Sequence, residues 1–415
     1  MFTLKKKLNN GIRVGELTTA HGRVHTPFFM PVGTVGSVKA MMPDELTELG
    51  AEIILCNTYH LYLRPGEKNI KRLGGLHKFM NWDGPILTDS GGYQVFSLAK
   101  KDGQSLVKIT EDGVEFKSHL DGSSHFFTPE KVIDVQLDLG VDILMPLDVC
   151  PSGKATRGEV EEAVRLTTLW AKRAKRHFDK RLESRAKGQE TVDMRRNASL
   201  SSLVSRRPML HGIVQGGLYD DLRKKSASEL IALDFDGYSV GGLAVDFETR
   251  DMWKIVKLMG EILPENKQRY LMGVGTPDDI IKATQLGMDM FDCVLPTRLA
   301  RHGSVYVHNN VILSHCESTD EVGRARREDP LVHEISRFTR NDRANQYELL
   351  NLLKSEYRLD DKPIDQGCGC EACKNKFSRA YISHLLRCNE ILGFRLTTTH
   401  NLWTYLSLMK DLRQS

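Results

Sequence analysis

This chain of 415 residues is short of several features that would define a simpler class of protein. No apolar run approaches the roughly 20 residues that cross a bilayer, and the lysine-rich start has no apolar run behind it. The net charge is only +4, so any nucleic-acid contact must come from local patches. Eight cysteines in so long a chain do not make a disulfide scaffold. We therefore expect a globular cytoplasmic enzyme or binding protein without a membrane span.

Short apolar runs recur along the first 300 residues, mostly separated by stretches with helical spacing. Eight runs have strand length: 27–32, 52–57, 85–88, 143–147, 210–214, 238–240, 270–274 and 290–295. Continuous apolar runs are typical of strands buried on both faces. Eight strands alternating with helices predict an α/β fold of the (β/α)8 or TIM-barrel type.

Polar or glycine-rich residues follow nearly every run. They are Gly33-Thr34, Asn57-Thr58-Tyr59-His60, Asp89-Ser90-Gly91-Gly92, Asp148, Gln215-Gly216-Gly217, Gly241-Gly242, Gly273-Val274-Gly275 and Asp292. In a barrel the carboxyl ends of the strands meet at one rim, where active sites are found. Glycine pairs also let the backbone approach a flat ligand closely. The sequence therefore predicts a functional site at this rim.

Asp292 lies inside the last apolar run, which ends at a proline and two arginines, Arg298 and Arg301. An acid in a buried strand is costly unless it is paired or has a function. For a lone aspartate the simpler interpretation is a buried cap of a neighbouring loop. The other polar groups expected at the same rim favour a functional role.

The alternation of strands and helices divides the chain into expected parts. Residues 1–300 form the expected barrel, opened by a hairpin over 2–17 that turns at Asn10-Gly11. Residues 301–400 form a zinc-binding subdomain, and 401–415 form a C-terminal helix that packs back on the barrel. Residues 180–207 are polar, basic and without periodicity. We expect them to be a mobile, solvated insertion, the alternative being an RNA or partner contact.

Three cysteines, Cys368, Cys370 and Cys373, lie within six residues of each other. Thiolates at this spacing fit tetrahedral Zn²⁺, which needs a fourth ligand. His400, His384 and Cys388 are the candidates, and we favour His400, since the helix is expected to end before it. Four protein ligands would close the metal to water and make it structural.

With these motifs in view, the chain resembles the bacterial tRNA-guanine transglycosylases of queuosine synthesis. The resemblance spans residues 2–400. It is carried by Asn57-Thr-Tyr-His60-Leu, Leu87-Thr-Asp-Ser-Gly-Gly-Tyr-Gln94, Gly212-Ile-Val-Gln-Gly-Gly217, Gly237-Tyr-Ser-Val-Gly-Gly-Leu243, Tyr270-Leu-Met-Gly-Val-Gly275, Phe291-Asp-Cys-Val-Leu-Pro-Thr-Arg298 and the cysteines followed by Ser378-Arg-Ala-Tyr381.

The resemblance implies a pentosyltransferase that exchanges guanine at the wobble position (34) of GUN-anticodon tRNAs. Retention at the ribose carbon is simplest through a covalent carboxylate ester. Asp292 would be the nucleophile, and Asp89 the general acid/base. The remaining base-binding residues that it implies are Asp148, Gln215, Gly242 and Leu243 at the edge of the base, Tyr93 and Met272 at its faces, and Ser90 and Gly91.

The resemblance further implies partners and a cofactor. The target base must leave its stack, so the substrate is a single-stranded anticodon loop, U33-G34-U35. Arg298 and Arg301 would hold its uridines or phosphates. One structural Zn²⁺ and a homodimer are implied, with Tyr381 and His384 in an aromatic interface.

Val245 and Cys150 match the smaller base pocket of bacterial enzymes, which implies 7-aminomethyl-7-deazaguanine (preQ1) as the incoming base. The chain ends at Ser415, so we expect no additional C-terminal RNA-binding domain.

Three places depart from the family pattern. Asp246-Phe247-Glu248 stands where the family has Gly-Glu, so the family glutamate has no counterpart in register. The link between Cys373 and Ser378 is one residue longer than usual, and residues 180–207 are longer than the usual connection. The function of that insertion and of Glu248 stays open.

Two other functions fit parts of the sequence. A non-catalytic tRNA-binding subunit would have lost the nucleophile, whereas this chain keeps both Asp89 and Asp292. A zinc-dependent hydrolase would need an open metal position, which a fourth protein ligand removes.

Overall fold

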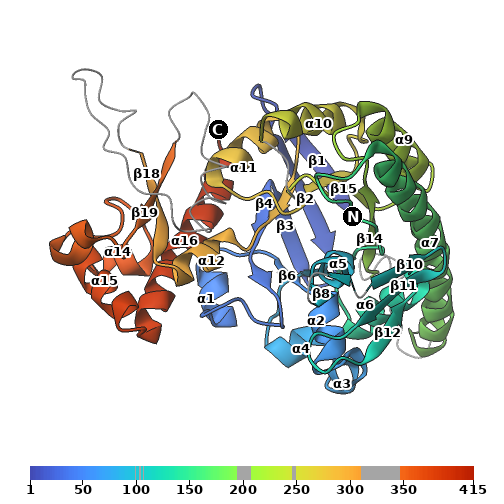
Figure 1. Cartoon of the computed structure of the whole chain (residues 1–415), viewed down its shortest axis with the longest axis horizontal. Coiled ribbons are helices and arrows are strands. Elements are labelled where there is room, and N and C mark those ends of the chain that lie inside the picture. The colour runs from blue at the N-terminus through green and yellow to red at the C-terminus, as the bar shows by residue number, and fades with distance from the viewer. Residues whose placement is uncertain (99, 102–103, 106, 194–206, 245–248, 310–345) are drawn as a thin grey trace.

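A computed structural model describes residues 1–98, 100–101, 104–105, 107–193, 207–244, 249–309 and 346–415 (Figure 1). Its centre is a parallel sheet of nine strands in the order β4-β17-β16-β15-β14-β13-β7-β6-β5. The strands are β4 (Phe28–Met30), β5 (Val32–Gly33), β6 (Ile54–Cys56), β7 (Ile86–Thr88), β13 (Ile143–Leu144), β14 (Met209–Val214), β15 (Gly237–Val240), β16 (Gln268–Leu271) and β17 (Met290–Asp292).

The two end strands of this order are neighbours in sequence, separated only by Pro31. Because β4 pairs with β17 and β5 pairs with β6, one interrupted strand joins both ends of the sheet. All residues of β14, β15 and β16 are buried, as expected for strands covered on both faces. The predicted (β/α)8 barrel is confirmed.

Helices follow the barrel strands and cover the outside of the sheet (Figure 1). They are α1 (Pro43–Glu48), α2 (Thr58–Leu63), α3 (Glu67–Arg72), α4 (Leu76–Met80), α5 (Gly92–Leu98), α6 (Pro129–Leu139), α7 (Arg157–Asp193), α9 (Asp220–Ile231), α10 (Thr249–Ile262), α11 (Pro277–Gln285) and α12 (Leu295–Arg301). Two of these helices begin with a side-chain cap and a proline at the first helical position. In α6 the Thr128 side chain accepts from Lys131 N, and in α11 the Thr276 side chain accepts from Asp279 N.

The N-terminal hairpin is confirmed and gains a third strand. β1 (Phe2–Lys7), β2 (Arg13–Thr19) and β3 (Gly22–Thr26) form an antiparallel sheet. The buried Arg13 guanidinium binds Asp289 at 3.0 Å and the carbonyl oxygen of Lys267 at 2.9 Å. Both residues precede barrel strands, so this sheet covers the N-terminal end of the barrel and leaves the opposite rim uncovered by it.

A second antiparallel sheet was not predicted. β10 (Val107–Thr110), β11 (Gly113–Lys117) and β12 (Ser124–Phe127) lie between β7 and α6, and the short strands β8 (Lys100–Lys101) and β9 (Gln104–Ser105) pair just before them. Phe116 and Phe127 are fully buried in a cluster with Tyr59 and Trp170. Buried aromatic packing therefore holds this sheet against α2 and α7.

The insertion differs from the expectation of an aperiodic segment, because α7 continues through residues 180–193 as a helix. The Arg185 guanidinium there donates to the carbonyl oxygen of Leu137 at 3.2 Å. Residues 194–206 of the insertion lie outside the described residues.

The C-terminal part forms a second body beside the barrel, in orange and red in Figure 1. We call it the cysteine unit. It comprises β18 (Ser304–His308), β19 (Tyr347–Asn351), the 3-10 helix η2 (Ser355–Leu359), α14 (Glu371–Lys374), α15 (Arg379–Arg387) and the first half of α16 (Ile391–Leu412).

Helix α16 begins at Ile391 and runs without a break to Leu412. The expected boundary between residues 400 and 401 therefore falls inside it, and the helix does not end before His400 as expected. Leu396 packs in the core of the cysteine unit, whereas Tyr405 and Met409 pack in the barrel core. One rigid helix therefore joins the two cores. In the described part of the chain, no helix is long and apolar enough to span a membrane.

Candidate active site and metal centre

The register of the parallel strands brings the predicted rim residues to the same end of the sheet. Cys56 pairs with Thr88, which places Asn57 beside Asp89. Leu271 pairs with Phe291, which places Met272 beside Asp292. The structure therefore assembles the rim that the sequence predicts.

Asp292 ends β17 and is held by two donors, one from the neighbouring strand β16 and one from the loop that follows it. The Tyr270 hydroxyl donates to its Oδ1 at 2.6 Å, and the backbone N–H of Gly273 donates to the same oxygen at 2.8 Å. Burial raises the pKa of Asp292, and these two hydrogen bonds oppose that rise by stabilising the anion. The carboxyl group is thus held in place through its Oδ1.

Asp89 has a different environment. Its Oδ1 accepts from the backbone N–H groups of Thr58 at 2.9 Å and Gly91 at 3.2 Å, and its Oδ2 accepts from Asn57 Nδ2. Burial raises the pKa of Asp89 to about 7, the hydrogen bonds oppose this rise, and the charges of Asp292 and Asp148 add to it. A carboxyl group with a pKa near neutrality can both give and accept a proton.

Asp148 and Gln215 form a buried polar pair at the rim. Gln215 Nε2 donates to Asp148 Oδ2 at 2.8 Å, and Ser90 Oγ donates to Oδ1 at 3.2 Å. Burial raises the pKa of Asp148, and both bonds lower it. Gln215 Oε1 is buried and has no hydrogen-bond partner among the described residues. An unpaired buried acceptor is costly, so this oxygen has the capacity to accept one more hydrogen bond.

Two glycines line this pair. A Cβ at Gly241 would lie 2.6 Å from Gln215 Nε2, and one at Gly242 would lie 2.8 Å from Gln215 Oε1. Both distances are too short for any side chain, and Gly242 also has a φ of +76°. Glycine at both positions therefore keeps the Gln215 amide in place.

Arg223 on α9 was missed by the sequence analysis. It is fully buried, and its guanidinium donates to the carbonyl oxygens of Val214 at 2.7 Å, Gly217 at 2.9 Å and Gly241 at 2.9 Å. Burial lowers the pKa of Arg223 to about 9. A single side chain thus ties together the chain segments on either side of Gln215 and the loop that follows β15.

The other predicted base-binding residues lie near these groups. Tyr93 lies in the first turn of α5 and is half exposed. A Cβ at Gly92 would contact the carbonyl oxygen of Asp148 at 3.1 Å, so this turn lies beside Asp148. Met272 is partly exposed and Leu243 is buried. Residues 245–248, including Val245 and Glu248, lie outside the described residues.

The two arginines lie on α12, which begins three residues after Asp292. Arg298 is partly exposed and Arg301 is exposed, and Arg301 Nη1 donates to the carbonyl oxygen of Thr297 at 2.9 Å. Burial and the charge of Arg298 lower the pKa of Arg301. Two cations therefore lie in the last turn of the helix that follows β17.

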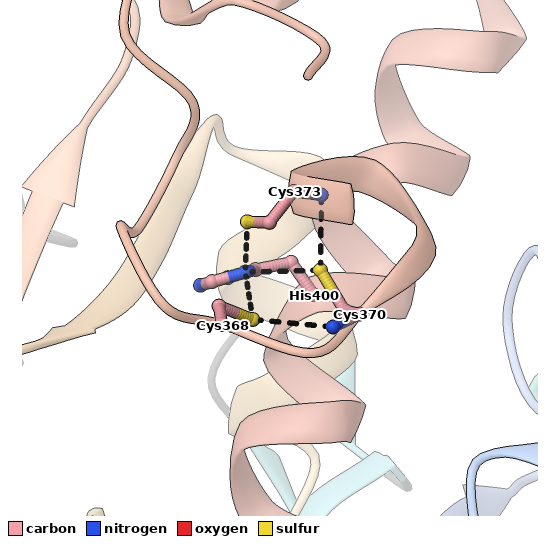
Figure 2. A group of neighbouring side chains, drawn as sticks. All are labelled: Cys368, Cys370, Cys373 and His400. Atoms are coloured by element: carbon pink, nitrogen blue, oxygen red, sulfur yellow. Dashed lines mark hydrogen bonds between the residues drawn. The ribbon is translucent and has the colours of Figure 1, made fainter. Parts of the chain in front are cut away.

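The predicted metal ligands come together in the cysteine unit (Figure 2). The sulfurs of Cys368, Cys370 and Cys373 each lie 3.5 Å from His400 Nδ1, and all four residues are buried. Tetrahedral zinc with Zn–S of about 2.3 Å and Zn–N of about 2.0 Å gives N···S separations of about 3.5 Å. The observed spacing fits a metal ion held by these four residues.

The surroundings orient these ligands. His400 Nε2 lies 2.7 Å from the carbonyl oxygen of Tyr306, which leaves Nδ1 free to face the sulfurs. Backbone N–H groups of Cys370 and Cys373 each donate at 3.4 Å to a preceding sulfur. The choice of His400 agrees with this geometry, but its reason was wrong, because His400 lies within α16 and not beyond its end. The alternatives His384 and Cys388 lie 3.9 Å from each other, outside the group.

Together, the barrel and its carboxyl-lined rim define an enzyme that acts at the carboxyl ends of its strands. Residues 9–415 match the family model described as queuine tRNA-ribosyltransferase. The chain belongs to this family of pentosyltransferases, as the resemblance implied.

Individual relatives agree with this assignment. A protein of Desulforamulus reducens named queuine tRNA-ribosyltransferase is 46% identical over 99% of this chain and 92% of its own length. A protein of the same name from Thermoanaerobacter pseudethanolicus is 47% identical over the same shares. One from Fusobacterium nucleatum is 47% identical over 97% of this chain and 90% of its own length.

Proposed function

We propose that this protein exchanges guanine at wobble position 34 of GUN-anticodon tRNAs for 7-aminomethyl-7-deazaguanine (preQ1), through a covalent Asp292–RNA intermediate. The observation that carries this proposal is the contrast between two rim carboxyl groups. Asp292 is held by two donors on one oxygen, whereas Asp89 has a pKa raised to about 7 by burial. Such a pair suits a nucleophile and a proton-transferring partner.

In the first step an Asp292 carboxylate oxygen attacks C1′ of the target ribose. The bond from C1′ to guanine N9 breaks, and its electron pair leaves with the base. Tyr270 and Gly273 hold the Oδ1 side of the carboxylate, which leaves Oδ2 for the new ester bond. The product is a glycosyl ester and an inverted ribose carbon.

Asp89 transfers the proton in both directions. In its protonated form it donates a proton to the departing guanine. The resulting carboxylate then accepts the N9 proton of the incoming base, whose nitrogen attacks C1′ and releases Asp292 as a carboxylate. Two inversions give net retention, and Asp89 returns to its protonated state.

The base is recognised by the groups beside these acids. Asp148, Gln215 and the backbone at Gly242 and Leu243 would bond the edge of the ring, with the unpaired Gln215 Oε1 as an acceptor. Tyr93 and Met272 would cover its faces, and Ser90 and Gly91 would complete the pocket. A Cβ at Gly242 would lie 3.7 Å from Cys150 Sγ, so a small side chain borders this place, in keeping with the small preQ1 base.

The anticodon loop U33-G34-U35 would enter beside α12, where Arg298 and Arg301 offer charge to its phosphates. We further propose one structural Zn²⁺ on Cys368, Cys370, Cys373 and His400, which would fix the cysteine unit without taking part in the chemistry. A homodimer through α15 is in keeping with Tyr381, which is 42% exposed, and with Ile391 nearby, which is 73% exposed.

Incorporation of radiolabelled guanine into tRNA with a UGU anticodon loop tests the proposed function. We expect incorporation into this tRNA and none into one whose wobble guanine is replaced. Absence of incorporation would favour the non-catalytic tRNA-binding subunit. The four ligands of the Cys3His group leave no open position for a water, which argues against a zinc-dependent hydrolase reaction at that group.

A further inference from the structure

A second group of metal-ligating side chains lies at the opposite end of the barrel from the rim. His21 is in the turn between β2 and β3, His77 is on α4, and Asp142 directly precedes β13. One ligand atom from each lies within 4.8 Å of the others. Three separate parts of the chain therefore bring two imidazoles and a carboxylate together.

Both histidines point at the same carboxyl group. His21 Nδ1 lies 2.8 Å from Asp142 Oδ1, and His77 Nε2 lies 3.2 Å from Asp142 Oδ2. The two rings stack at 3.5 Å between centroids. Without a metal ion, each imidazole hydrogen-bonds to Asp142. With a metal ion bound, His21 Nδ1, His77 Nε2 and Asp142 Oδ1 would be its ligand atoms.

Asp142 is itself rigid. Its backbone N–H donates to Ile86 O and its carbonyl oxygen accepts from Met209 N, so it is fixed between barrel strands. Oδ2 also accepts from Ile86 N at 2.9 Å, and the carboxyl group is 1% exposed. Among the described residues Oδ1 is hydrogen-bonded to His21 alone, so this oxygen can exchange an imidazole N–H for a cation.

The Asp142 carboxylate supplies the negative charge of the site. Burial alone would raise the pKa of Asp142, but the hydrogen bonds from His21 and His77 outweigh it and lower this pKa to about 2. The hydrogen bond to Asp142 also raises the pKa of His21, so a cation has to displace a proton from this imidazole.

We propose that His21, His77 and Asp142 form a second site for a divalent transition-metal ion, distinct from the Cys3His group. Two imidazoles and a carboxylate suit borderline ions such as Zn²⁺ and give hard ions such as Mg²⁺ little advantage. Three protein ligands leave a position for water, so this site would be open and weaker than the closed one.

Binding requires one local movement. The ligand atoms of a tetrahedral zinc ion are about 3.3 Å apart. The ion lies in the plane of each imidazole that binds it, and two stacked imidazoles cannot both meet this condition. The His21 side chain is 37% exposed in a turn, whereas that of His77 is only 13% exposed. The His21 ring is therefore the one that rotates. Each ring nitrogen gives up its proton, either to the other nitrogen or to solvent. The bound ion would tie the N-terminal sheet to α4 and the barrel.

Equilibrium dialysis of the purified zinc-containing protein against Zn²⁺, followed by metal analysis, tests this proposal. We expect two zinc ions per chain in the unaltered protein and one in His21→Gln and in His77→Gln. His177→Gln is the matched control, because His177 Nε2 also binds a carboxylate, Asp134, at 3.0 Å, but with a single imidazole. This variant should keep both ions, and Mg²⁺ should not replace the second.

Added Zn²⁺ should also raise the unfolding temperature of the unaltered protein and of His177→Gln, but not that of His21→Gln, whose change lies in an exposed turn and leaves the core intact. Guanine exchange should be the same in all of them. A single zinc ion in the unaltered protein would overturn the proposal. So would a second ion that survives both His21→Gln and His77→Gln, since it would then lie elsewhere, for example at His384 and Cys388.

Discussion

The rim of the barrel and the Cys3His group are both clusters of buried polar side chains, but their hydrogen bonds are completed in different ways. At the rim, burial raises the pKa of Asp89, Asp148 and Asp292, and the Gln215 carbonyl oxygen has no partner among the described residues. In the cysteine unit, His400 faces three equidistant sulfurs and uses its other nitrogen for Tyr306.

This difference separates a site suited to binding a substrate from a site suited to holding a structural metal ion. Raised pKa values and an unpaired acceptor cost free energy in the folded state, and a substrate that completes the hydrogen bonds recovers it. A closed tetrahedral group has no position left for a substrate, so its binding energy goes into folding. Changes at the rim should therefore alter activity, and changes at the metal group should alter stability.

The largest expected effect on activity is that of Asp292→Asn. Removing the nucleophile should lower guanine exchange on the order of 10³-fold or more, because the amide cannot form the ester. Zinc content and unfolding temperature should stay unchanged, since the amide oxygen can still accept from Tyr270 and Gly273. Full exchange activity in this variant would refute the mechanism.

The largest expected effect on stability is that of His400→Ala. Loss of the fourth ligand should release zinc and destabilise the cysteine unit by about 3–5 kcal/mol. Metal analysis and thermal unfolding measure this, with His384→Ala as the control that keeps its zinc. Zinc lost only from His384→Ala would prove the ligand assignment wrong.

Arg223→Met should lower both the exchange activity and the stability, each to a smaller extent. Three buried carbonyl oxygens would lose a charged donor, which should lower the free energy of unfolding by about 2–4 kcal/mol. Because the loops at Gly217 and Gly241 would loosen, KM for the base should rise about tenfold, with KM for tRNA nearly unchanged.

Arg223→Lys can reach some of these carbonyl oxygens and should recover part of the loss. Arg165→Met, which removes an exposed arginine on α7, is the matched control. An equal rise in both KM values, or none, would remove Arg223 from base binding.

The rate of guanine release should also change with pH, without any substitution. The pKa of Asp89 is raised to about 7, so the carboxyl group is protonated below that pH. Single-turnover release of guanine needs this proton, and its rate should fall about tenfold per unit above pH 7. A release rate that does not change through pH 7 would contradict the role of Asp89.

The raised pKa of Asp89 also makes the stability of the folded state depend on pH. Between about pH 4 and pH 7 the folded state holds a proton at Asp89 that the unfolded state has lost. This group therefore contributes less stability as pH rises through that range. Thermal unfolding of Asp89→Asn should show a weaker decline over the same interval.

Much of the fold could be predicted because the barrel strands are apolar runs with polar ends. The acids Asp89, Asp148 and Asp292 follow from the same pattern, since the carboxyl ends of parallel strands meet at one rim. The cysteine spacing likewise fixes three ligands locally. These predictions needed only short-range patterns.

The features that were missed depend on tertiary contacts. Tyr270 reads as a core aromatic, and Arg223 reads as one charge on an ordinary surface helix. The helix before His400 was expected to end ahead of that residue, but α16 continues through it. Thr397 is instead fully buried, and its hydroxyl bonds the carbonyl oxygens of Gly393 and Ala300, so packing outweighs propensity.

The central claim is that the rim forms a covalent intermediate through Asp292. The most direct measurement is trapping of the enzyme–RNA adduct on a denaturing gel, with an anticodon stem–loop substrate and an inhibitor of the second step. We predict a stable adduct in the unaltered protein, mapped to Asp292 by mass spectrometry, and none in Asp292→Asn. An adduct that persists in Asp292→Asn, or that maps to Asp89, would contradict the account.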